Sequence, residues 1–365
     1  MSNDKRWNAF LDYAASSTLH PKAREAIFKA IENWPISLDE SLKIIDNAKE
    51  LFAKLINASR EEIALIPNIT TSVVTVINSL PLSSKTGIVT NNLEFPSNRF
   101  TWQVASRYGY KVREVIFKGI IPDEGKIVKA ISSDDYLIAI SHVFYQSGYR
   151  VNLKELYEVS KAKDALLFVD AYQSVGAIRV NAKLTDFLVC GSGKWLMSIP
   201  GSGFLYVSRR IIDQLRPPYR GWMSTINPKD FSAESYIPSS TASKLESGFP
   251  AIIGYIAITE VMKEILNFGL YNVESRVLSL TQWLIDELNK FKLIDIITPS
   301  IPSKRAGIIS FTGKFDIQKL YNFLYNNRIK VSKRDNLIRI SIHYITNEEE
   351  IQLLINYLKE FFRRF

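Results

Sequence analysis

Residues 166–194 read LLFVDAYQSVGAIRVNAKLTDFLVCGSGK. This stretch begins with the most apolar strand-like run of the chain, Leu166–Asp170, and contains a second run at Phe187–Cys190. Short apolar runs of this kind are typical of strands that are buried on both faces of a parallel sheet. A carboxylate, Asp170, closes the first run, and a glycine-bearing turn with Lys194 follows the second. The stretch therefore predicts two strands at the centre of an α/β fold.

The same alternation extends in both directions from residue 60 to about residue 207. Helical patterns such as Ser97–Tyr108 and Leu153–Lys161 separate the short apolar runs. Strands that alternate with amphipathic helices predict a largely parallel sheet covered by helices. The seven expected strands are Ile63–Ile66, Thr86–Thr90, Lys111–Ile116, Tyr136–Ile140, Leu166–Asp170, Phe187–Cys190 and Phe204–Val207.

The C-terminal third has a different pattern. Residues 216–246 are rich in Pro and Ser and predict a long loop. The expected elements after it are helices at Pro250–Asn267, Leu270–Phe291, Ile317–Asn326 and Asn347–Phe362, with short strands at Gly307–Ser310 and Ile338–Ser341. We therefore expect a large domain at 58–245, a small α+β domain at 246–365, and an N-terminal segment, 1–57, that packs beside the small domain.

Composition limits the class of protein. The chain has 365 residues, of which 46% are hydrophobic, and a formal net charge of +9. Its basic residues are mixed with acidic ones along the chain, which favours a solvated surface over a nucleic-acid interface. The longest apolar run, Ala251–Ile258, is shorter than the roughly 20 residues of a membrane span. The first ten residues lack the apolar stretch of a secretory signal. We expect a soluble, cytoplasmic protein that binds neither membrane nor nucleic acid.

Cysteine and histidine are scarce. The single cysteine, Cys190, excludes an internal disulfide and suits a reducing compartment. The three histidines, His20, His142 and His343, are far apart and lack the short spacings of zinc ligands. No metal site is expected.

Lys194 is the candidate for the central chemistry. Labilising bonds at the Cα atom of an amino acid requires an electron sink, and a shielded lysine supplies one by holding pyridoxal phosphate as an imine. Asp170 can pair with a protonated pyridine nitrogen, and Gln173 can donate an amide N–H to the phenolate oxygen. The alternatives are a surface lysine at 194 and a helix N-cap at Asp170 for residues from Ala171 onward.

A phosphate site is expected at residues 68–72, which read Asn-Ile-Thr-Thr-Ser and precede the apolar run Val73–Ile77. This pattern predicts a helix N-terminus, where free N–H groups and the helix dipole favour an anion. Hydroxyl residues are also common there simply as caps.

Together these motifs resemble the class V aminotransferases, which include cysteine desulfurases, kynureninases and isopenicillin N epimerase-like proteins. The resemblance rests on 169–177 (VDAYQSVGA), 191–196 (GSGKWL) and 200–207 (PGSGFLYV), and it extends from Leu11–Ala15 to Ile338–His343. It implies the aspartate-aminotransferase fold, also called fold type I, with pyridoxal 5'-phosphate as cofactor. It also implies a homodimer with active sites at the subunit interface.

The resemblance implies a role for each matching residue. Lys194 corresponds to the Schiff-base lysine, and Arg339 to the arginine that holds the substrate α-carboxylate. The remaining cofactor-binding positions are Asp170 and Gln173 on the ring, Phe95 stacked against it, and Thr71, Ser72 and Ser192 around the phosphate.

Several positions depart from the cysteine desulfurases. Residues 329–334 contain no cysteine, although desulfurases carry a nucleophilic cysteine shortly before the arginine strand. Phe249 stands where relatives have a threonine that reaches the partner subunit's phosphate, and Lys244 stands near a common arginine. Tyr145 replaces an asparagine, and with Gln146 and Trp222 we expect it to shape the substrate pocket.

The sequence thus predicts an aminotransferase acting on a small amino acid through Lys194, with a 2-oxo acid as a possible acceptor. Transamination needs only the lysine, the electron sink and a carboxylate clamp. A kynureninase-like or other lyase, which Phe95 supports, and an epimerase are the alternatives among enzymes. A scaffold without catalytic activity and a basic nucleic-acid-binding protein are the alternatives outside them.

Overall fold

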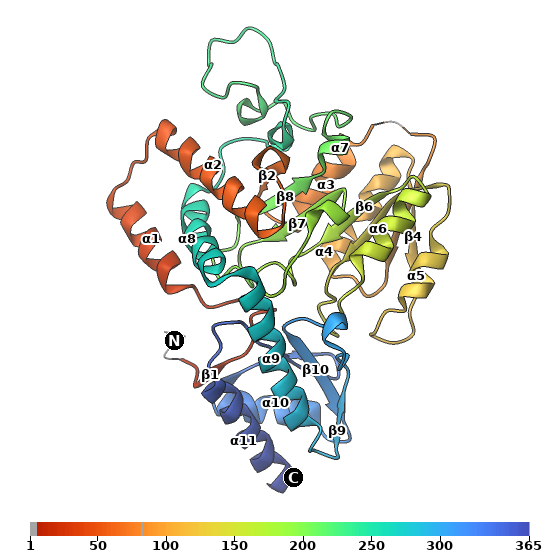
Figure 1. The fold of residues 1–365 in the computed structure, drawn as a ribbon, viewed down its shortest axis with the longest axis vertical. Coiled ribbons are helices and arrows are strands. Elements are labelled where there is room, and N and C mark those ends of the chain that lie inside the picture. The colour runs from red at the N-terminus through yellow and green to blue at the C-terminus, as the bar shows by residue number, and fades with distance from the viewer. Residues whose placement is uncertain (1–5, 82, 365) are drawn as a thin grey trace.

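The computed structural model describes residues 6–81 and 83–364, and its largest element is a seven-stranded sheet (Figure 1). Six of its strands run parallel and β8 runs antiparallel to both of its neighbours. In spatial order they are β2 (Ile63–Ile66), β8 (Gly203–Val207), β7 (Phe187–Gly191), β6 (Leu166–Asp170), β5 (Asp135–Ser141), β3 (Gly87–Asn91) and β4 (Lys111–Val115). The predicted wide, mostly parallel sheet is confirmed.

Helices cover both faces of this sheet. On strand β6, Leu167 and Val169 pack in one apolar cluster with residues of α5 (Glu124–Ala130) and α6 (Leu153–Ala162). Phe168 points to the opposite face and packs with residues of α3 (Ile69–Ser79). Because both faces are buried, the strand is continuously apolar. The predicted helix at 97–108 is divided into α4 (Pro96–Arg99) and the 3-10 helix η2 (Thr101–Tyr108).

A smaller antiparallel sheet forms the lower part of the molecule in Figure 1. Its strands, in spatial order, are β12 (Ser332–Arg334), β13 (Leu337–Ser341), β10 (Ile308–Gly313) and β9 (Ile294–Ile296). Residues of α9 (Leu270–Leu288), α10 (Ile317–Asn326) and α11 (Glu348–Arg364) share one apolar cluster with this sheet. The predicted smaller α+β part is therefore present.

The N-terminal segment contacts both parts. Strand β1 (Ala9–Phe10) pairs in parallel with β11 (Ile329–Lys330), which lies in the small part. Helix α2 (Leu38–Leu55) instead packs with α8 (Ile252–Phe268) in the cluster that contains Leu188 and Phe204 of the large sheet, and α1 (Pro21–Glu32) lies beside them (Figure 1). The division of the chain at residues 57 and 245 stays a prediction, and this packing favours placing α2 and α8 with the large sheet.

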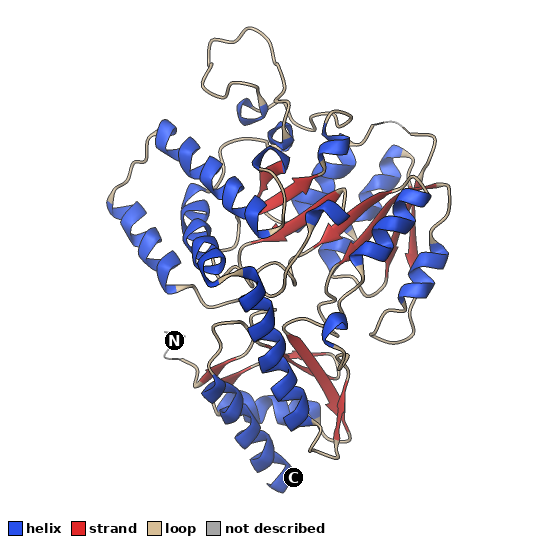
Figure 2. Ribbon diagram, in the orientation of Figure 1, coloured by secondary structure: helices blue, strands red, loops and turns tan. Residues whose placement is uncertain are grey.

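Residues 216–246 are irregular, as predicted. They contain only the 3-10 turns η4 (Trp222–Ser224) and η5 (Ala242–Leu245) and an isolated bridge between Thr225 and Pro238. Figure 2 shows part of this region as a loop that projects from the top of the molecule. In the described part of the chain, no helix is both long and apolar enough to cross a membrane.

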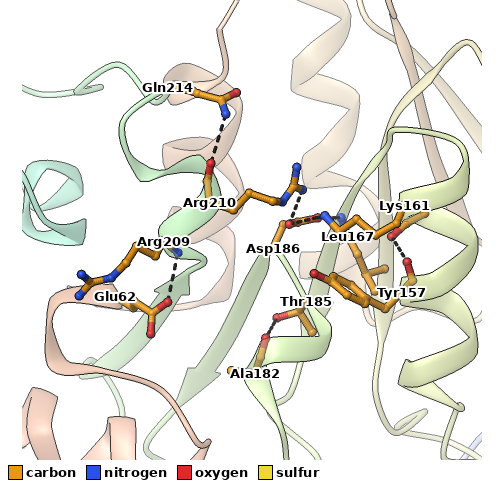
Figure 3. A network of polar contacts seen from close by, with 11 residues as sticks. Glu62, Tyr157, Lys161, Leu167, Ala182, Thr185, Asp186, Arg209, Arg210 and Gln214 are labelled. Carbon is orange, nitrogen blue, oxygen red and sulfur yellow. Dashed lines mark hydrogen bonds and ion pairs between the residues drawn. The ribbon is translucent and has the colours of Figure 1, made fainter.

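The amino-terminal edge of the sheet is held by an ionic network around the buried carboxylate of Asp186 (Figure 3). Asp186, directly before β7, accepts hydrogen bonds from Lys161 Nζ at 3.0 Å, Arg210 Nη2 at 2.6 Å and the Leu167 backbone N–H at 2.9 Å. These bonds link α6, β6 and the segment after β8 to the start of β7. They fix the register of β6 and β7, whose other ends carry Asp170 and the turn to Lys194.

Candidate active site

Lys194 lies in a tightly closed turn beyond the carboxyl end of β7. The Ser192 N–H donates to the Ser202 carbonyl at 3.1 Å, and the Met197 N–H donates to the Lys194 carbonyl at 3.0 Å. The Lys194 ammonium is 4.3 Å from the centre of the Tyr172 ring and 5.3 Å from that of Phe95. Gly191 makes this possible, since a Cβ there would lie 2.7 Å from the Tyr172 Cζ atom. The turn therefore presents the amine between two aromatic rings.

The environment of Lys194 destabilises its protonated form. Burial lowers its pKa to about 8, with further lowering by the charges of Arg339 and Arg334, while Asp170 opposes the shift. A lysine that loses its proton near neutral pH can act as a nucleophile or a base. Of the two predicted alternatives for Lys194, the structure favours the shielded lysine over an ordinary surface cation.

A cavity of about 210 Å³ opens in front of Lys194. It brings together five of the predicted site residues, and its lining includes Phe95, Tyr145, Asp170, Gln173 and Lys194. Asn68, at the start of α3, and Tyr172 also line it. Segments from five parts of the sequence thus converge at the carboxyl edge of the parallel strands, which is where ligands bind in folds of this type.

Asp170 ends β6 with only 6% of its surface exposed. Its Oδ1 accepts the Tyr172 N–H at 2.9 Å. Burial raises the pKa of Asp170, and the bond from Tyr172 and the charge of Lys194 oppose this shift. The alternative of a helix N-cap is wrong, because residues 171–178 form turns. Gly176, at φ +92°, redirects the chain there.

Gln173 is oriented by two hydrogen bonds. The Trp195 indole N–H donates to its Oε1 at 2.9 Å, and its Nε2 donates to the Ala14 carbonyl at 3.0 Å. Because an indole nitrogen can only donate, the Oε1 atom is fixed on that side. The amide nitrogen has a second hydrogen, and Gln173 belongs to the lining of the cavity.

The predicted helix N-terminus is confirmed as the start of α3. Asn68 is its N-cap, and its Oδ1 accepts the Thr71 N–H at 2.9 Å. The Ser72 hydroxyl donates to the Asn68 carbonyl at 3.1 Å. Ser192 donates its hydroxyl to the Ile199 carbonyl and accepts that of Ser202 at 3.0 Å. A phosphate-binding role for Thr71, Ser72 and Ser192 stays a prediction.

Phe95 is placed by a residue whose importance the sequence did not reveal. Glu94, with 3% of its surface exposed, accepts hydrogen bonds from the amides of Asn91 and Asn98, both at 2.8 Å, and from the N–H and hydroxyl of Ser141. Burial raises its pKa to about 7, and these bonds oppose the shift. The only signal in the sequence is an acid next to the expected stacking residue.

Arg339 is almost fully buried, with 1% of its surface exposed. Its Nη1 donates to the Tyr145 carbonyl at 2.9 Å and its Nη2 to the Ser332 hydroxyl at 3.3 Å. Asp12 Oδ1 lies 3.6 Å from Nη2. The Nε atom is buried and has no hydrogen-bond partner in the described part of the chain. Burial lowers the pKa of Arg339 to about 10, with Asp12 opposing. An incompletely satisfied guanidinium suits a carboxylate ligand.

Six predicted site residues do not line this cavity: Thr71, Ser72, Ser192, Arg339, Gln146 and Trp222. The Gln146 Nε2 donates to Asp335 at 3.0 Å, and the Trp222 ring stacks on Phe249 with centroids 6.1 Å apart. Lys244 donates to the Ile212 carbonyl at 3.1 Å. The substrate roles of Gln146 and Trp222 stay predictions, and so do the inferences drawn from Phe249 and Lys244 about a partner subunit.

The donors and acceptors around the cavity fit a pyridine-aldehyde phosphate. The fit rests on an amine whose pKa burial lowers to about 8, a buried carboxylate on the adjacent strand, and the amide of Gln173 at the cavity wall. The adjoining helix start and the unpartnered Nε of Arg339 provide for two anions, a phosphate and a carboxylate.

Known proteins have related sequences and the same fold. The chain is 28% identical to an uncharacterised aminotransferase, YcbU, of Bacillus subtilis over 91% of this chain and 90% of the relative. It is 26% identical to a probable cysteine desulfurase of Methanothermobacter thermautotrophicus, over 87% of this chain and 83% of the relative. The solved structure of a cysteine desulfurase from Thermococcus onnurineus NA1 superposes with a TM-score of 0.86 at 22% identity, covering 98% of this chain and 95% of the other.

The family described as aminotransferase class-V matches residues 9–354, nearly the whole chain. That span contains every residue that lines the cavity, and it includes both Lys194 and Arg339. Pyridoxal 5'-phosphate is the cofactor that this family implies. The chain belongs to the class V aminotransferase family of pyridoxal-phosphate enzymes.

Proposed function

We propose that this protein is an aminotransferase that acts on a small amino acid and holds its cofactor on Lys194 as a Schiff base. The observation that carries the proposal is the placement of Lys194, whose pKa burial lowers to about 8, in a cavity that it shares with Asp170. Arg339, buried and with an unpartnered Nε, adds a carboxylate site whose charge acts on Lys194.

Four parts of the chain would hold the cofactor. Asp170 would keep a proton on the pyridine nitrogen, and the spare N–H of Gln173 would bond the phenolate oxygen. Phe95 would lie against the ring, and the start of α3 with Ser192 would take the phosphate. When bound, pyridoxal phosphate supplies the electron sink that weakens bonds at the Cα atom of an amino acid.

Arg339 and Lys194 would act on the substrate. Arg339 would hold the α-carboxylate, with Tyr145 and Ser332 fixing the plane of its guanidinium. Lys194 would remove the Cα proton, because its amine is uncharged in a large fraction of molecules near pH 8. Transamination asks for no further residue, and a 2-oxo acid would be the amino acceptor.

A kynureninase-like or other lyase reaction is the second candidate, with epimerisation as a variant. The Phe95 ring in the cavity favours it, since an apolar ring can stack but cannot relay a proton. Persulfide chemistry of the desulfurase type is disfavoured. Cys190 is the only cysteine, it is buried in β7, and burial raises the pKa of its thiol.

The assembly and compartment complete the proposal. We expect a homodimer, as the class V resemblance implies, and a cytoplasmic location, which the single cysteine suits. Light scattering of the purified protein should give twice the chain mass of 41.6 kDa. A monomer that binds one cofactor per chain would contradict the proposed dimer but would leave the proposed reaction unaffected.

The test is the absorbance of the purified protein after incubation with pyridoxal phosphate. We expect a band near about 420 nm in the wild type and its loss in Lys194→Ala, with exposed Lys183→Ala as the matched control. An added amino acid should move the band and release a 2-oxo acid. Release of a side-chain fragment would favour the lyase, and inversion at Cα the epimerase. No band in the wild type would contradict the enzyme and favour a scaffold.

A further inference from the structure

A second arginine of the small sheet, Arg334, has a buried nitrogen atom without a hydrogen-bond partner among residues 6–81 and 83–364. This atom is Nε, and the same is true of the Nε of Arg339. Buried guanidinium nitrogens are normally satisfied, so each exception requires an explanation. Because the two unpartnered Nε atoms of Arg334 and Arg339 belong to one small sheet, they indicate a ligand with two anionic groups.

The strand register places both arginines on one face of the small sheet. Ser332 of β12 pairs with Arg339 of β13, and Arg334 pairs with Leu337. Side chains two apart on a strand share a face, so Arg334 lies on the face of Ser332 and of Arg339. Ser332 contacts Arg339 through its hydroxyl, which confirms the direction of this face.

The charges on this face are not balanced by the chain. Asp12 is shared between Arg339 at 3.6 Å and Lys330 at 3.7 Å. Asp335, next to Arg334, accepts a hydrogen bond from Gln146. Within residues 6–81 and 83–364, Arg334 forms no ion pair with a carboxylate within 4.0 Å. Its positive charge nevertheless acts on Lys194 and Tyr145, both of which line the cavity.

We propose that Arg334 binds a side-chain carboxylate of the amino acid whose α-carboxylate Arg339 holds, so that the substrate is an acidic amino acid of the aspartate or glutamate type. The inference rests on the proposed function and names its substrate class. A guanidinium suits this role because its fork meets a carboxylate with two parallel hydrogen bonds. The cofactor phosphate is the competing anion, but its expected site is the start of α3, on the large sheet.

The first experiment compares amino acids as substrates of the holoenzyme. The wild type should prefer L-aspartate or L-glutamate to L-asparagine, L-glutamine and L-alanine. Arg334→Leu should raise the KM for the acidic substrate roughly tenfold to a hundredfold and leave that for L-alanine within about twofold. Arg334→Lys should restore part of the loss. Lys333→Leu is the matched control, because residue 333 points to the other face of β12.

The second experiment needs no turnover. Calorimetric titration of the holoenzyme should show tighter binding of glutarate or succinate than of butyrate, and Arg334→Leu should abolish this difference. If that difference is present but no amino acid reacts, the dicarboxylate site stands and the proposed function fails. If amino acids react but acidic and neutral ones are used equally, the inference fails and the function stands. If Arg334→Leu weakens the binding of pyridoxal phosphate instead, Arg334 serves the phosphate and the inference is wrong.

Discussion

Asp170 and Asp186 are both buried in the central sheet, at opposite ends of its strands, and they differ in how completely the chain satisfies them. Asp186 has no exposed surface and accepts hydrogen bonds from Lys161, Arg210 and the Leu167 N–H. Asp170 accepts a hydrogen bond from one backbone N–H, and Lys194 acts on it through charge alone. The buried carboxylate at the amino edge of the sheet is therefore fully paired, whereas the one at the carboxyl edge is not.

This difference distinguishes a residue that stabilises the fold, Asp186, from residues that bind a ligand. A buried charge costs free energy unless it is paired, so the complete network at Asp186 contributes to stability. An incompletely paired charge at Asp170, and the unpartnered Nε atoms of Arg334 and Arg339, cost stability in the free protein and gain their partners from a ligand. Each prediction below challenges one side of this comparison.

The largest effect is expected for Asp170→Asn. Loss of the carboxylate removes the proton-holding partner of the pyridine ring, so kcat/KM should fall by roughly 10²–10³. The asparagine Oδ1 can still accept the Tyr172 N–H, so the free energy of unfolding should stay within about 0.5 kcal/mol. Steady-state kinetics and urea unfolding on the same preparation measure both. A variant that retains activity but unfolds easily would reverse the assignment of this residue.

The corresponding substitution at the amino edge of the sheet is Asp186→Asn. The amide keeps one acceptor oxygen but loses the negative charge that pairs with Lys161 and Arg210, and its NH2 group replaces an oxygen that accepts from these donors, so the free energy of unfolding should fall by about 3 kcal/mol. Activity per folded molecule should not change, because these groups belong to the other edge of the sheet. Denaturant unfolding, with active sites counted by cofactor absorbance, provides the check. An unchanged midpoint would show that the exposed cations rehydrate at no cost.

A smaller effect is expected for Arg339→Lys. Lysine keeps the positive charge but cannot donate two parallel hydrogen bonds to the α-carboxylate, so the KM for the amino acid should rise about tenfold with little change in kcat. Exposed Arg364→Lys is a suitable control. A fall in kcat at unchanged KM would instead place Arg339 in the chemical step.

The smallest effect concerns pH and the cofactor-free protein. Burial holds the pKa of Lys194 at about 8 in the folded chain, against an ordinary value of 10.5, so the unfolded chain binds more protons between these values. Stability should therefore rise with pH through this window. Lys194→Met should lack this contribution, so the wild type should gain about 1 kcal/mol relative to the variant between pH 7.5 and pH 9. If the free energy of unfolding rose with pH at the same slope in both proteins, the pKa of Lys194 would not be lowered in the folded chain.

The sequence identified the parts of the fold that have local signals. The central strands β6 and β7 were predicted because they are buried on both faces and are therefore continuously apolar. Strands β1 and β9 were missed because they have only two and three residues and depend on distant partners. The wrong N-cap at Asp170 has a similar cause, since a carboxylate before a turn and one before a helix look alike in sequence.

The candidate site shows the same limit. Lys194, Asp170 and Gln173 belong to one compact motif, so a sequence could indicate them. Asp12 and Ser332 around Arg339 come from opposite ends of the chain, and only the folded structure brings them together. Likewise, only the register of β12 and β13 shows that Arg334 lies on the same face of the sheet as Arg339.

The most direct test of the central claim is to reduce the protein with borohydride after loading it with pyridoxal phosphate, and to map the modified peptide by mass spectrometry. Reduction makes an imine between the cofactor and a lysine permanent. We expect a single phosphopyridoxyl group on the peptide containing Lys194, and none in Lys194→Ala. Stoichiometric label on another lysine, or a wild type that carries no label, would contradict this claim.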